Sequence, residues 1–193
     1  MPTKLLKTFI KEILKEEESL RWSMIPGKKL RVFDLDDCLV HSNSKIHVKK
    51  ASGNSLVLTA GQYAVYEKEP GDEFDYSEFQ KLVDPEVIEW TLKILKRVVG
   101  KCGINGAVIL TARGTKEPAE EFLNMNGIPG VPVVALNDSH PDSKAQWILM
   151  VIKRFGYAEV EFFDDSPKNI KAVNNIKSKV SPGVKVITRL IKP

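Results

Sequence analysis

Five short apolar runs, separated by longer amphipathic stretches, constrain the fold more than any other feature of the sequence. The apolar runs cover residues 30–35, 106–111, 131–136, 160–163 and 184–188. Spacing typical of helices is found at residues 85–101, 116–126, 143–155 and 167–178. Because the runs are apolar on both faces and helices separate them, they predict a parallel sheet with helices on each side. The expected fold class is therefore α/β.

One connection is too long for this alternation. More than forty residues separate Leu39 from Pro85, whereas a loop between a strand and a helix usually takes about 2–6 residues. Residues 45–50 and 55–59 flank the turn sequence ASGN and predict a hairpin. We therefore expect a core of residues 1–39 and 85–193, with residues 40–84 forming a small inserted subdomain.

Two further segments complete the expected organisation. Thr59 and Gln62 fit a capping box that opens a short helix inside the insertion, and residues 70–79 are expected as turn and extended chain. Residues 3–19 repeat apolar pairs at helical spacing and predict a helix that packs its apolar stripe on the domain. A helix lying on a membrane surface is the alternative, and its acidic end argues against it.

Three aspartates stand at the end of the first apolar run, in the sequence RVFDLDDCLV. Asp34, Asp36 and Asp37 each cost several kcal/mol to bury without a partner, which indicates a cation among them. Ligands of open parallel sheets bind at the carboxyl ends of the strands. Further polar residues follow the second and the fourth runs at such ends: Thr111, Arg113, Asp164 and Asp165. Carboxylates, waters and a substrate phosphate are ligands that Mg²⁺ takes, so we expect a Mg²⁺ site there.

Each piece, taken alone, also has an ordinary structural interpretation. An Asp-x-Asp pair commonly marks a loop or a cap, and Asp165 or Ser166 fits the N-cap of a helix with Pro167 in its first turn. Thr111 fits the last residue of a strand, and Lys144 fits a solvated position on a helix. The occurrence of all these pieces in one order, at strand ends or a helix start, favours a site.

Four segments in this order resemble the motifs of the haloacid dehalogenase (HAD) superfamily of phosphohydrolases: VFDLDDCLV, VILTARG, Lys144 and FFDDSPKN. The resemblance covers about residues 30–178. It implies a Rossmann-like core with a small cap inserted after the first strand. It also implies a role for each matching residue, namely the nucleophile Asp34, the general acid/base Asp36, the phosphate-binding hydroxyl of Thr111, the basic residue Lys144 and the metal ligand Asp164.

The chemistry of the residues agrees with these implied roles. A carboxylate that attacks phosphorus forms an aspartyl-phosphate and divides one difficult hydrolysis into two steps. A second carboxyl group can protonate the leaving oxygen and then deprotonate the attacking water. The expected metal-binding residues are Asp34, Asp36, Asp164 and Asp165, with Asn169 in support. The expected substrate-binding residues are Thr111, Arg113 and Lys144, although a surface ion pair is an equal alternative for Arg113.

Two positions depart from the common pattern of the superfamily. Asp37 replaces a glycine, and Cys38 stands where threonine or valine is usual. Cys38 is expected to be a small buried residue and no second nucleophile. The three histidines share no ligand spacing, so a zinc site is not expected.

The insertion also combines aromatic and basic residues, namely Tyr63, Tyr66, Phe74 and Tyr76 near Lys45, Lys49, Lys50 and Lys68. Such a mixture can stack bases and contact phosphates. Equally, a small subdomain needs aromatic side chains for a core of its own.

These observations favour a Mg²⁺-dependent phosphatase. The leading substrate is a phosphorylated DNA or RNA end or a nucleotide, because the sequence is also loosely similar to the phosphatase domains of polynucleotide kinase–phosphatases. A phosphatase of a small metabolite or a phosphoprotein is the first alternative. The second is a non-catalytic phosphate-binding module on the same fold. The net charge of +4 permits a polyanionic partner without requiring one.

The cellular setting is expected to be cytoplasmic or otherwise intracellular. Cys38 and Cys102 make no disulfide framework, which indicates reducing conditions. No apolar run approaches the ~18 residues of a transmembrane helix, and no signal-peptide pattern opens the chain, so no membrane association is expected. The sequence does not indicate an oligomeric state.

Overall fold

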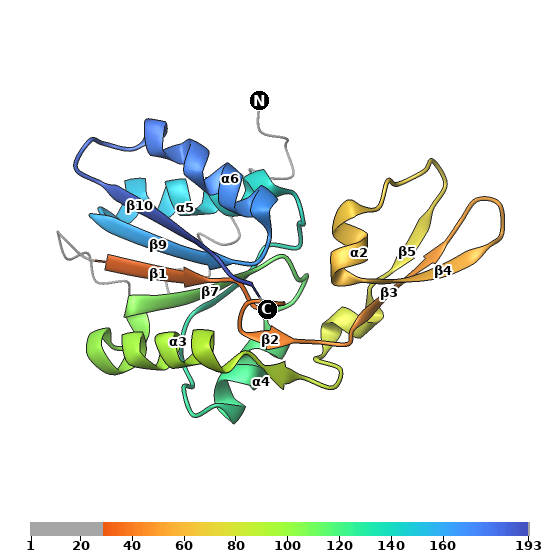
Figure 1. Ribbon diagram of the computed structural model, residues 1–193, viewed down its shortest axis with the longest axis horizontal. Helices are drawn as coiled ribbons and strands as arrows, with labels where there is room; N and C mark the ends of the chain where they lie inside the picture. The colour runs from red at the N-terminus through yellow and green to blue at the C-terminus, as the bar shows by residue number, and fades with distance from the viewer. Residues whose placement is uncertain (1–28, 193) are drawn as a thin grey trace.

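The computed structural model describes residues 29–192, so the helix expected at residues 3–19 lies outside the described residues. Five parallel strands form the central sheet in the order β10-β9-β1-β7-β8, with helices on both faces (Figure 1). The strands are β1 (Lys29–Phe33), β7 (Ala107–Thr111), β8 (Val133–Ala135), β9 (Glu159–Asp164) and β10 (Lys185–Leu190). The fold class is therefore α/β, with a sheet compatible with a Rossmann-like core.

The order of the strands reverses at β1. The chain passes from β1 to β7 and β8 on one side, and then crosses to β9 and β10 on the other. Phe33 of β1 lies opposite Ile109 of β7 and opposite Phe163 of β9. Such a reversal is the place where open parallel sheets bind their ligands. The residues that follow β1 and β9 therefore lie at the position that this topology favours for a site.

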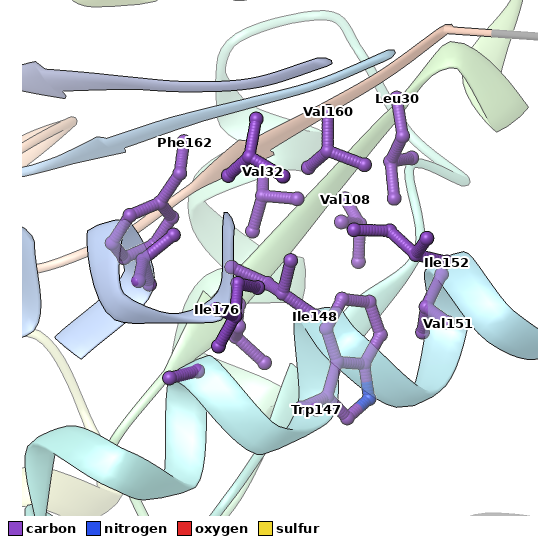
Figure 2. Close-up of a cluster of buried hydrophobic side chains, with 14 of the residues drawn as sticks. Leu30, Val32, Val108, Trp147, Ile148, Val151, Ile152, Val160, Phe162 and Ile176 are labelled. Atoms are coloured by element: carbon purple, nitrogen blue, oxygen red, sulfur yellow. The ribbon is translucent and has the colours of Figure 1, made fainter. Parts of the chain in front are cut away.

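One face of the sheet packs against α5 (Pro141–Phe155) and α6 (Pro167–Asn175). Leu30 and Val32 of β1 point to this face because alternate residues of a strand face opposite ways. Figure 2 shows them with Ile148 and Trp147 of α5 in one buried cluster. Pro141 opens α5, and Gly156 closes it in the left-handed conformation that glycine adopts without strain.

The opposite face packs against α3 (Glu89–Cys102) and α4 (Glu117–Met125). Phe33 and Phe163 stack there, with ring centroids 4.5 Å apart. The helix expected from residue 85 begins only at Glu89, because Glu86 and Val87 form the short strand β6 (Glu86–Val87) and pair with β2 (Val40–His41). Two short 3₁₀ turns, η2 (Ile104–Gly106) and η3 (Ile176–Lys179), complete the core.

Residues between β2 and β6 form a second, smaller sheet beyond the end of β1 (Figure 1). It contains β3 (Lys45–Lys49), β4 (Ser55–Thr59) and β5 (Glu73–Asp75), in the order β4-β3-β5. The helix α2 (Ala60–Val65) and the 3₁₀ turn η1 (Ser77–Gln80) belong to the same segment. The hairpin of β3 and β4 and the Thr59–Gln62 capping box are confirmed, whereas β5 adds a third strand within the expected extended chain.

Within residues 29–192, the helices are too short or too polar to cross a lipid bilayer.

Candidate active site

Asp34 follows β1 directly and is held by its neighbours on two sides. Its backbone N–H donates to the carbonyl of Phe163 over 2.9 Å, which extends the pairing of β1 with β9 by one residue. Its Oδ1 accepts the N–H of Leu35 at 2.8 Å. The residue is only 7% exposed. A carboxylate is thus fixed in a buried position at the point where the strand order reverses.

Asp34 meets Asp164 and Asp165 across the ends of β1 and β9. Each of the three residues offers a carboxylate oxygen, and these oxygens all lie within 4.8 Å of one another. Asp34 and Asp164 are buried, and Asp165 is partly buried. The expectation that these three carboxylates converge is therefore confirmed. The carboxylate of Asp36, the fourth expected metal-binding residue, forms no part of this cluster.

Lys144 enters the cluster from the first turns of α5. Its Nζ lies 2.8 Å from Oδ1 of Asp34 and 2.8 Å from Oδ2 of Asp164, and the side chain is 3% exposed. Burial alone would lower the pKa of Lys144, but the two carboxylates outweigh burial and raise it. The residue therefore stays a cation and links the ends of β1 and β9.

One ammonium group does not balance the carboxylates. Burial raises the pKa of Asp34 well above its ordinary value; Lys144 opposes that shift, and Asp164 adds to it. Burial, followed by the charge of Asp164, raises the pKa of Asp165 to about 6. With every group ionised, three carboxylates and one ammonium leave two negative charges. Oxygen ligands and this charge fit a divalent cation such as Mg²⁺.

The start of α6 orients Asp164. Nδ2 of Asn169 donates to both carboxylate oxygens of Asp164, at 3.0 and 3.1 Å, and the N–H of Ser166 donates to Oδ1 at 2.8 Å. The side chain of Ser166 also caps the helix by accepting the N–H of Asn169. The helix start expected from the sequence is therefore present, and the same turn orients Asp164, which is compatible with the expected site.

Thr111 ends β7, the other neighbour of β1, and Arg113 comes two residues later. Thr111 is fully buried, and its Oγ1 accepts the N–H of Arg113 at 3.1 Å. Thr111 therefore ends the strand at the same edge of the sheet as Asp34. Its role as the phosphate-binding hydroxyl stays a prediction.

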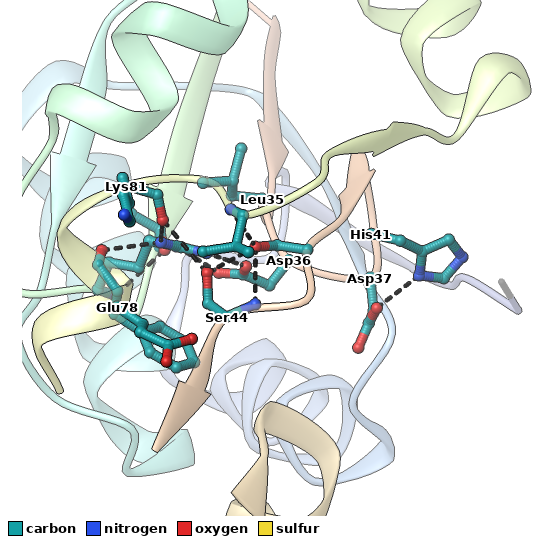
Figure 3. A network of polar contacts seen from close by, with 12 residues as sticks. Leu35, Asp36, Asp37, His41, Ser44, Glu78 and Lys81 are labelled. Carbon is teal, nitrogen blue, oxygen red and sulfur yellow. Dashed lines mark hydrogen bonds and ion pairs between the residues drawn. The ribbon is translucent and has the colours of Figure 1, made fainter. Parts of the chain in front are cut away.

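Asp36 pairs with Arg113. Its two carboxylate oxygens accept Nη2 of Arg113 at 2.6 Å and Nε at 2.9 Å. The ion pair that the sequence left open for Arg113 is present and partly buried, since the side chain of Arg113 is 1% exposed and that of Asp36 is 23% exposed. In Figure 3, Asp36 lies in a polar network with Ser44 and Lys81 of the insertion. Arg113 is already engaged there, so a direct substrate contact stays a prediction.

The two departures from the superfamily pattern have simple local explanations. Asp37 has a φ of 53°, a left-handed conformation that glycine adopts freely and that aspartate tolerates. Its carboxylate lies 2.7 Å from Nδ1 of His41, and Figure 3 shows this pair apart from the Asp36 network. Cys38 is buried, and burial followed by the charge of Asp34 raises the pKa of its thiol. Cys38 is therefore a packing residue, as expected.

The insertion uses most of its aromatic and basic residues internally. Tyr63, Tyr66 and Phe74 pack against the small core of Ile46, Val48 and Leu58. Lys49 pairs with Glu73 at 3.6 Å and Lys50 with Glu69 at 3.0 Å. The interpretation of these aromatics as the core of the subdomain is favoured, whereas Tyr76 remains 41% exposed.

Sequence reasoning missed the backbone carbonyls of Phe79 and Lys81, which accept Nη1 of Arg113 at 2.8 and 3.0 Å. No sequence signal announces such acceptors, because every residue carries a carbonyl and only the fold decides which ones meet a distant arginine.

Comparisons of the chain with protein-family models, with curated proteins and with solved structures found no match.

Proposed function

We propose that this protein is a Mg²⁺-dependent phosphatase of the HAD type, which hydrolyses a phosphate monoester through an aspartyl-phosphate on Asp34. The observation that carries the proposal is the buried cluster of Asp34, Asp164 and Asp165 with Lys144 at the reversal of the strand order. A structural salt bridge would need one carboxylate for one ammonium. A cluster of three carboxylates with one ammonium, which contacts Asp34 and Asp164, instead suits a cation and an anionic substrate.

In the first step, an oxygen of Asp34 forms a bond to phosphorus while the bond from phosphorus to the leaving oxygen breaks. The carboxyl group of Asp36 gives its proton to that oxygen. In the second step, Asp36 takes a proton from water as the water oxygen attacks phosphorus, which frees Asp34 and releases phosphate. Thr111 and Lys144 would hold the remaining oxygens of the phosphoryl group.

The carboxylates of Asp34, Asp164 and Asp165 would hold the metal ion, and Asn169 would orient Asp164. When bound, Mg²⁺ would supply positive charge that offsets the repulsion between an anionic nucleophile and an anionic phosphate. Lys144 serves the same end from the protein, because its ammonium already touches Asp34.

The insertion of residues 40–84 is proposed as a small cap over this site. After the short strand β2, it consists of one three-stranded sheet, one short helix and a 3₁₀ turn, and it follows the loop that carries Asp34 and Asp36. A cap this small is less suited to enclosing a small metabolite than to admitting a phosphate on the end of a larger molecule. We therefore retain a phosphorylated nucleic-acid end as the leading substrate.

Hydrolysis of 4-nitrophenyl phosphate with and without Mg²⁺ tests the proposed activity. We expect turnover that needs the metal and is lost on chelation. Beryllium fluoride, which mimics a phosphoryl group on a carboxylate, should inhibit the wild type and fail to bind Asp34→Asn. Phosphate binding by a wild type that turns over none of a panel of phosphate esters would instead indicate a non-catalytic module.

A screen of substrates separates the two phosphatase alternatives. The panel should contain 3′-phosphorylated oligonucleotides, nucleotides, sugar phosphates and phosphopeptides, compared by kcat/KM. A preference for sugar phosphates or phosphopeptides would replace the nucleic-acid interpretation while leaving the proposed chemistry intact.

A further inference from the structure

The side chain of Arg113 joins the loop after β1, which carries Asp36, to the segment of the insertion that contains Phe79 and Lys81. On one edge of the guanidinium, Nε and Nη2 donate to the two oxygens of Asp36 at 2.9 and 2.6 Å. On the other, Nη1 donates to the carbonyls of Phe79 and Lys81 at 2.8 and 3.0 Å. Four of its five N–H bonds are thus used, and the side chain is 1% exposed.

These contacts restrict the movement of the Asp36 carboxylate relative to the carbonyls of Phe79 and Lys81. A guanidinium is a rigid planar fork, so a shift of the carbonyls on one edge moves the carboxylate on the other. The ring of Phe79 lies against the plane, with its centroid 4.8 Å from Cζ of Arg113, and resists rotation of the fork. Each carboxylate oxygen of Asp36 keeps a lone pair that Arg113 does not use, so the group can still exchange a proton.

The carbonyl of Lys81 lies in the connection between the core and the insertion. The hydroxyl of Ser44 donates to the carbonyl of Lys81 at 3.2 Å and lies 2.7 Å from the hydroxyl of Ser42. The N–H of Asn43 donates to the carbonyl of Val83 at 2.8 Å. The two chain segments that enter and leave the insertion are therefore tied together where Arg113 is attached.

We infer that Arg113 is a positioning residue, which sets the orientation of the Asp36 carboxylate according to the position of the insertion. The inference rests on the proposed function, in which Asp36 is the general acid/base. Arg113 then acts through Asp36 and not on the substrate. A displacement of the insertion would therefore reach the acid/base group through the side chain of Arg113.

A double-mutant cycle of Arg113→Gln and Asp36→Asn tests this inference, with single-turnover phosphorylation by an alkyl phosphate and by 4-nitrophenyl phosphate. We expect Arg113→Gln to lower kcat for the alkyl phosphate by up to ~100-fold. The nitrophenyl ester should be affected less, because 4-nitrophenolate leaves as an anion and needs no proton, and KM should be nearly unchanged. In the Asp36→Asn background, Arg113→Gln should have no further effect.

Arg31→Gln is the matched control, because Arg31 also forms partly buried ion pairs in the sheet, with Glu159 and Glu161. It should lower the melting temperature without any dependence on the leaving group. If Arg113→Gln does not fold, Arg113→Lys keeps the charge but cannot bridge both partners, and it should show the same dependence on the leaving group.

Three results would overturn the inference. Equal losses for both esters would leave Arg113 a purely structural residue. A raised KM and a full additional loss in the Asp36→Asn background would make it a substrate-binding residue. In both cases, activity of the wild type would still support the proposed function. Absence of turnover by the wild type, in contrast, would remove the proposed function and this inference together.

Discussion

Three carboxylates and the ammonium of Lys144 share a small buried space, and their charges do not cancel. Burial raises the pKa of Asp34, and the charge of Asp164 adds to that shift. Without a cation, the folded protein therefore contains a carboxylate whose ionised form is unfavourable. The ionised side chain of Asp34, the proposed nucleophile, therefore lowers the stability of the metal-free folded protein.

The first prediction is that Asp34→Asn abolishes turnover and stabilises the metal-free protein. The amide is nearly isosteric, but it carries no charge and is a far weaker nucleophile. A rise of a few degrees in melting temperature is expected, since ~1 kcal/mol corresponds to about 2–4 °C in a domain of this size. Thermal unfolding in a chelator and an ester hydrolysis assay measure both effects. Near wild-type turnover, or a melting temperature below that of the wild type, would contradict it.

The second prediction concerns pH. The pKa of Asp165 in the folded protein is about 6, above its ordinary value of 3.8. The folded state thus favours the protonated carboxyl, so its contribution to stability is complete below about pH 4 and is lost as pH rises through about 6. Asp34 shifts in the same direction. Mg²⁺ must displace these protons to bind.

Melting temperatures with and without Mg²⁺, at about pH 5 and about pH 8, measure this linkage. The increase in melting temperature caused by Mg²⁺ should be larger at the higher pH. Asp165→Asn should flatten the pH dependence of the metal-free protein, because it removes one titrating group. Equal stabilisation by Mg²⁺ at both values would show that the carboxylates do not bind the metal.

At the scale of the elements, the first turn of α6 has two tasks that different side chains perform. Ser166 caps the helix, and Asn169 holds both oxygens of Asp164. The third prediction is that Asn169→Ala raises the Mg²⁺ concentration for half-maximal activity by ~10–100-fold. Ser166→Ala should mainly cost stability, ~0.5–2 kcal/mol, because the backbone N–H that contacts Asp164 remains.

Titration of activity with Mg²⁺, beside chemical denaturation of both variants, separates these effects. An unchanged Mg²⁺ requirement in Asn169→Ala would mean that Asp164 is not a metal ligand or needs no orientation.

The strands of the core were predictable from the sequence because a strand covered on both faces must be apolar throughout. All five apolar runs became strands, and the run at 131–136 was shortened to Val133–Ala135. Pro132 explains the later start, since proline has no N–H to donate to a neighbouring strand. The order of the strands was not predictable, because hydrophobic periodicity describes the environment of a strand and not its neighbour.

The site was predictable only in part, for a related reason. Asp164 ends β9, Asp34 and Asp165 come directly after β1 and β9, and the ends of parallel strands meet at one edge of the sheet. The contact between Asp36 and Arg113 spans 77 positions of sequence. This contact depends on the conformation of the loop after β7 and of the segment that leads from the insertion back to the core. Neither segment has a periodic sequence pattern. Residues at or directly after the ends of strands were therefore placed correctly, whereas the pairing of Asp36 with Arg113 was not foreseen.

At the scale of the whole molecule, positive charge lies mainly outside the insertion. Residues 40–84 contain five lysines and seven acidic residues, and Lys49 and Lys50 are in ion pairs. Residues 166–192 contain seven basic residues and no acidic one: Lys168, Lys171, Lys177, Lys179, Lys185, Arg189 and Lys192. This basic segment begins at the turn that holds Asp164, and α6 leads away from it (Figure 1).

Three of these lysines are suited to contact a polyanion. Lys171, Lys177 and Lys179 are exposed, and among residues 29–192 the structure records no ion pair for any of them. They follow one another along α6, which starts at the candidate site, and along η3, which comes directly after it. On the proposed function, a nucleic acid with its terminal phosphate at Asp34 would gain more from this surface than from the paired lysines of the insertion.

The fourth prediction is that a 3′-phosphorylated oligonucleotide is a better substrate than a 3′-mononucleotide, and that Lys171→Gln, Lys177→Gln and Lys179→Gln together reduce this advantage. The advantage should grow with oligonucleotide length and shrink as salt rises, because phosphate contacts release counterions. The triple variant should weaken that salt dependence, by up to about 0.7 in log–log slope for each lost contact with a single strand.

Replacing Lys96, Arg97 and Lys101 on α3 by glutamine removes the same charge from the opposite face of the sheet and should have a smaller effect. Both variants should hydrolyse 4-nitrophenyl phosphate like the wild type. Equal losses in the two triple variants would show that only the overall charge matters, and a mononucleotide that is preferred at low salt would favour a small substrate enclosed by the insertion.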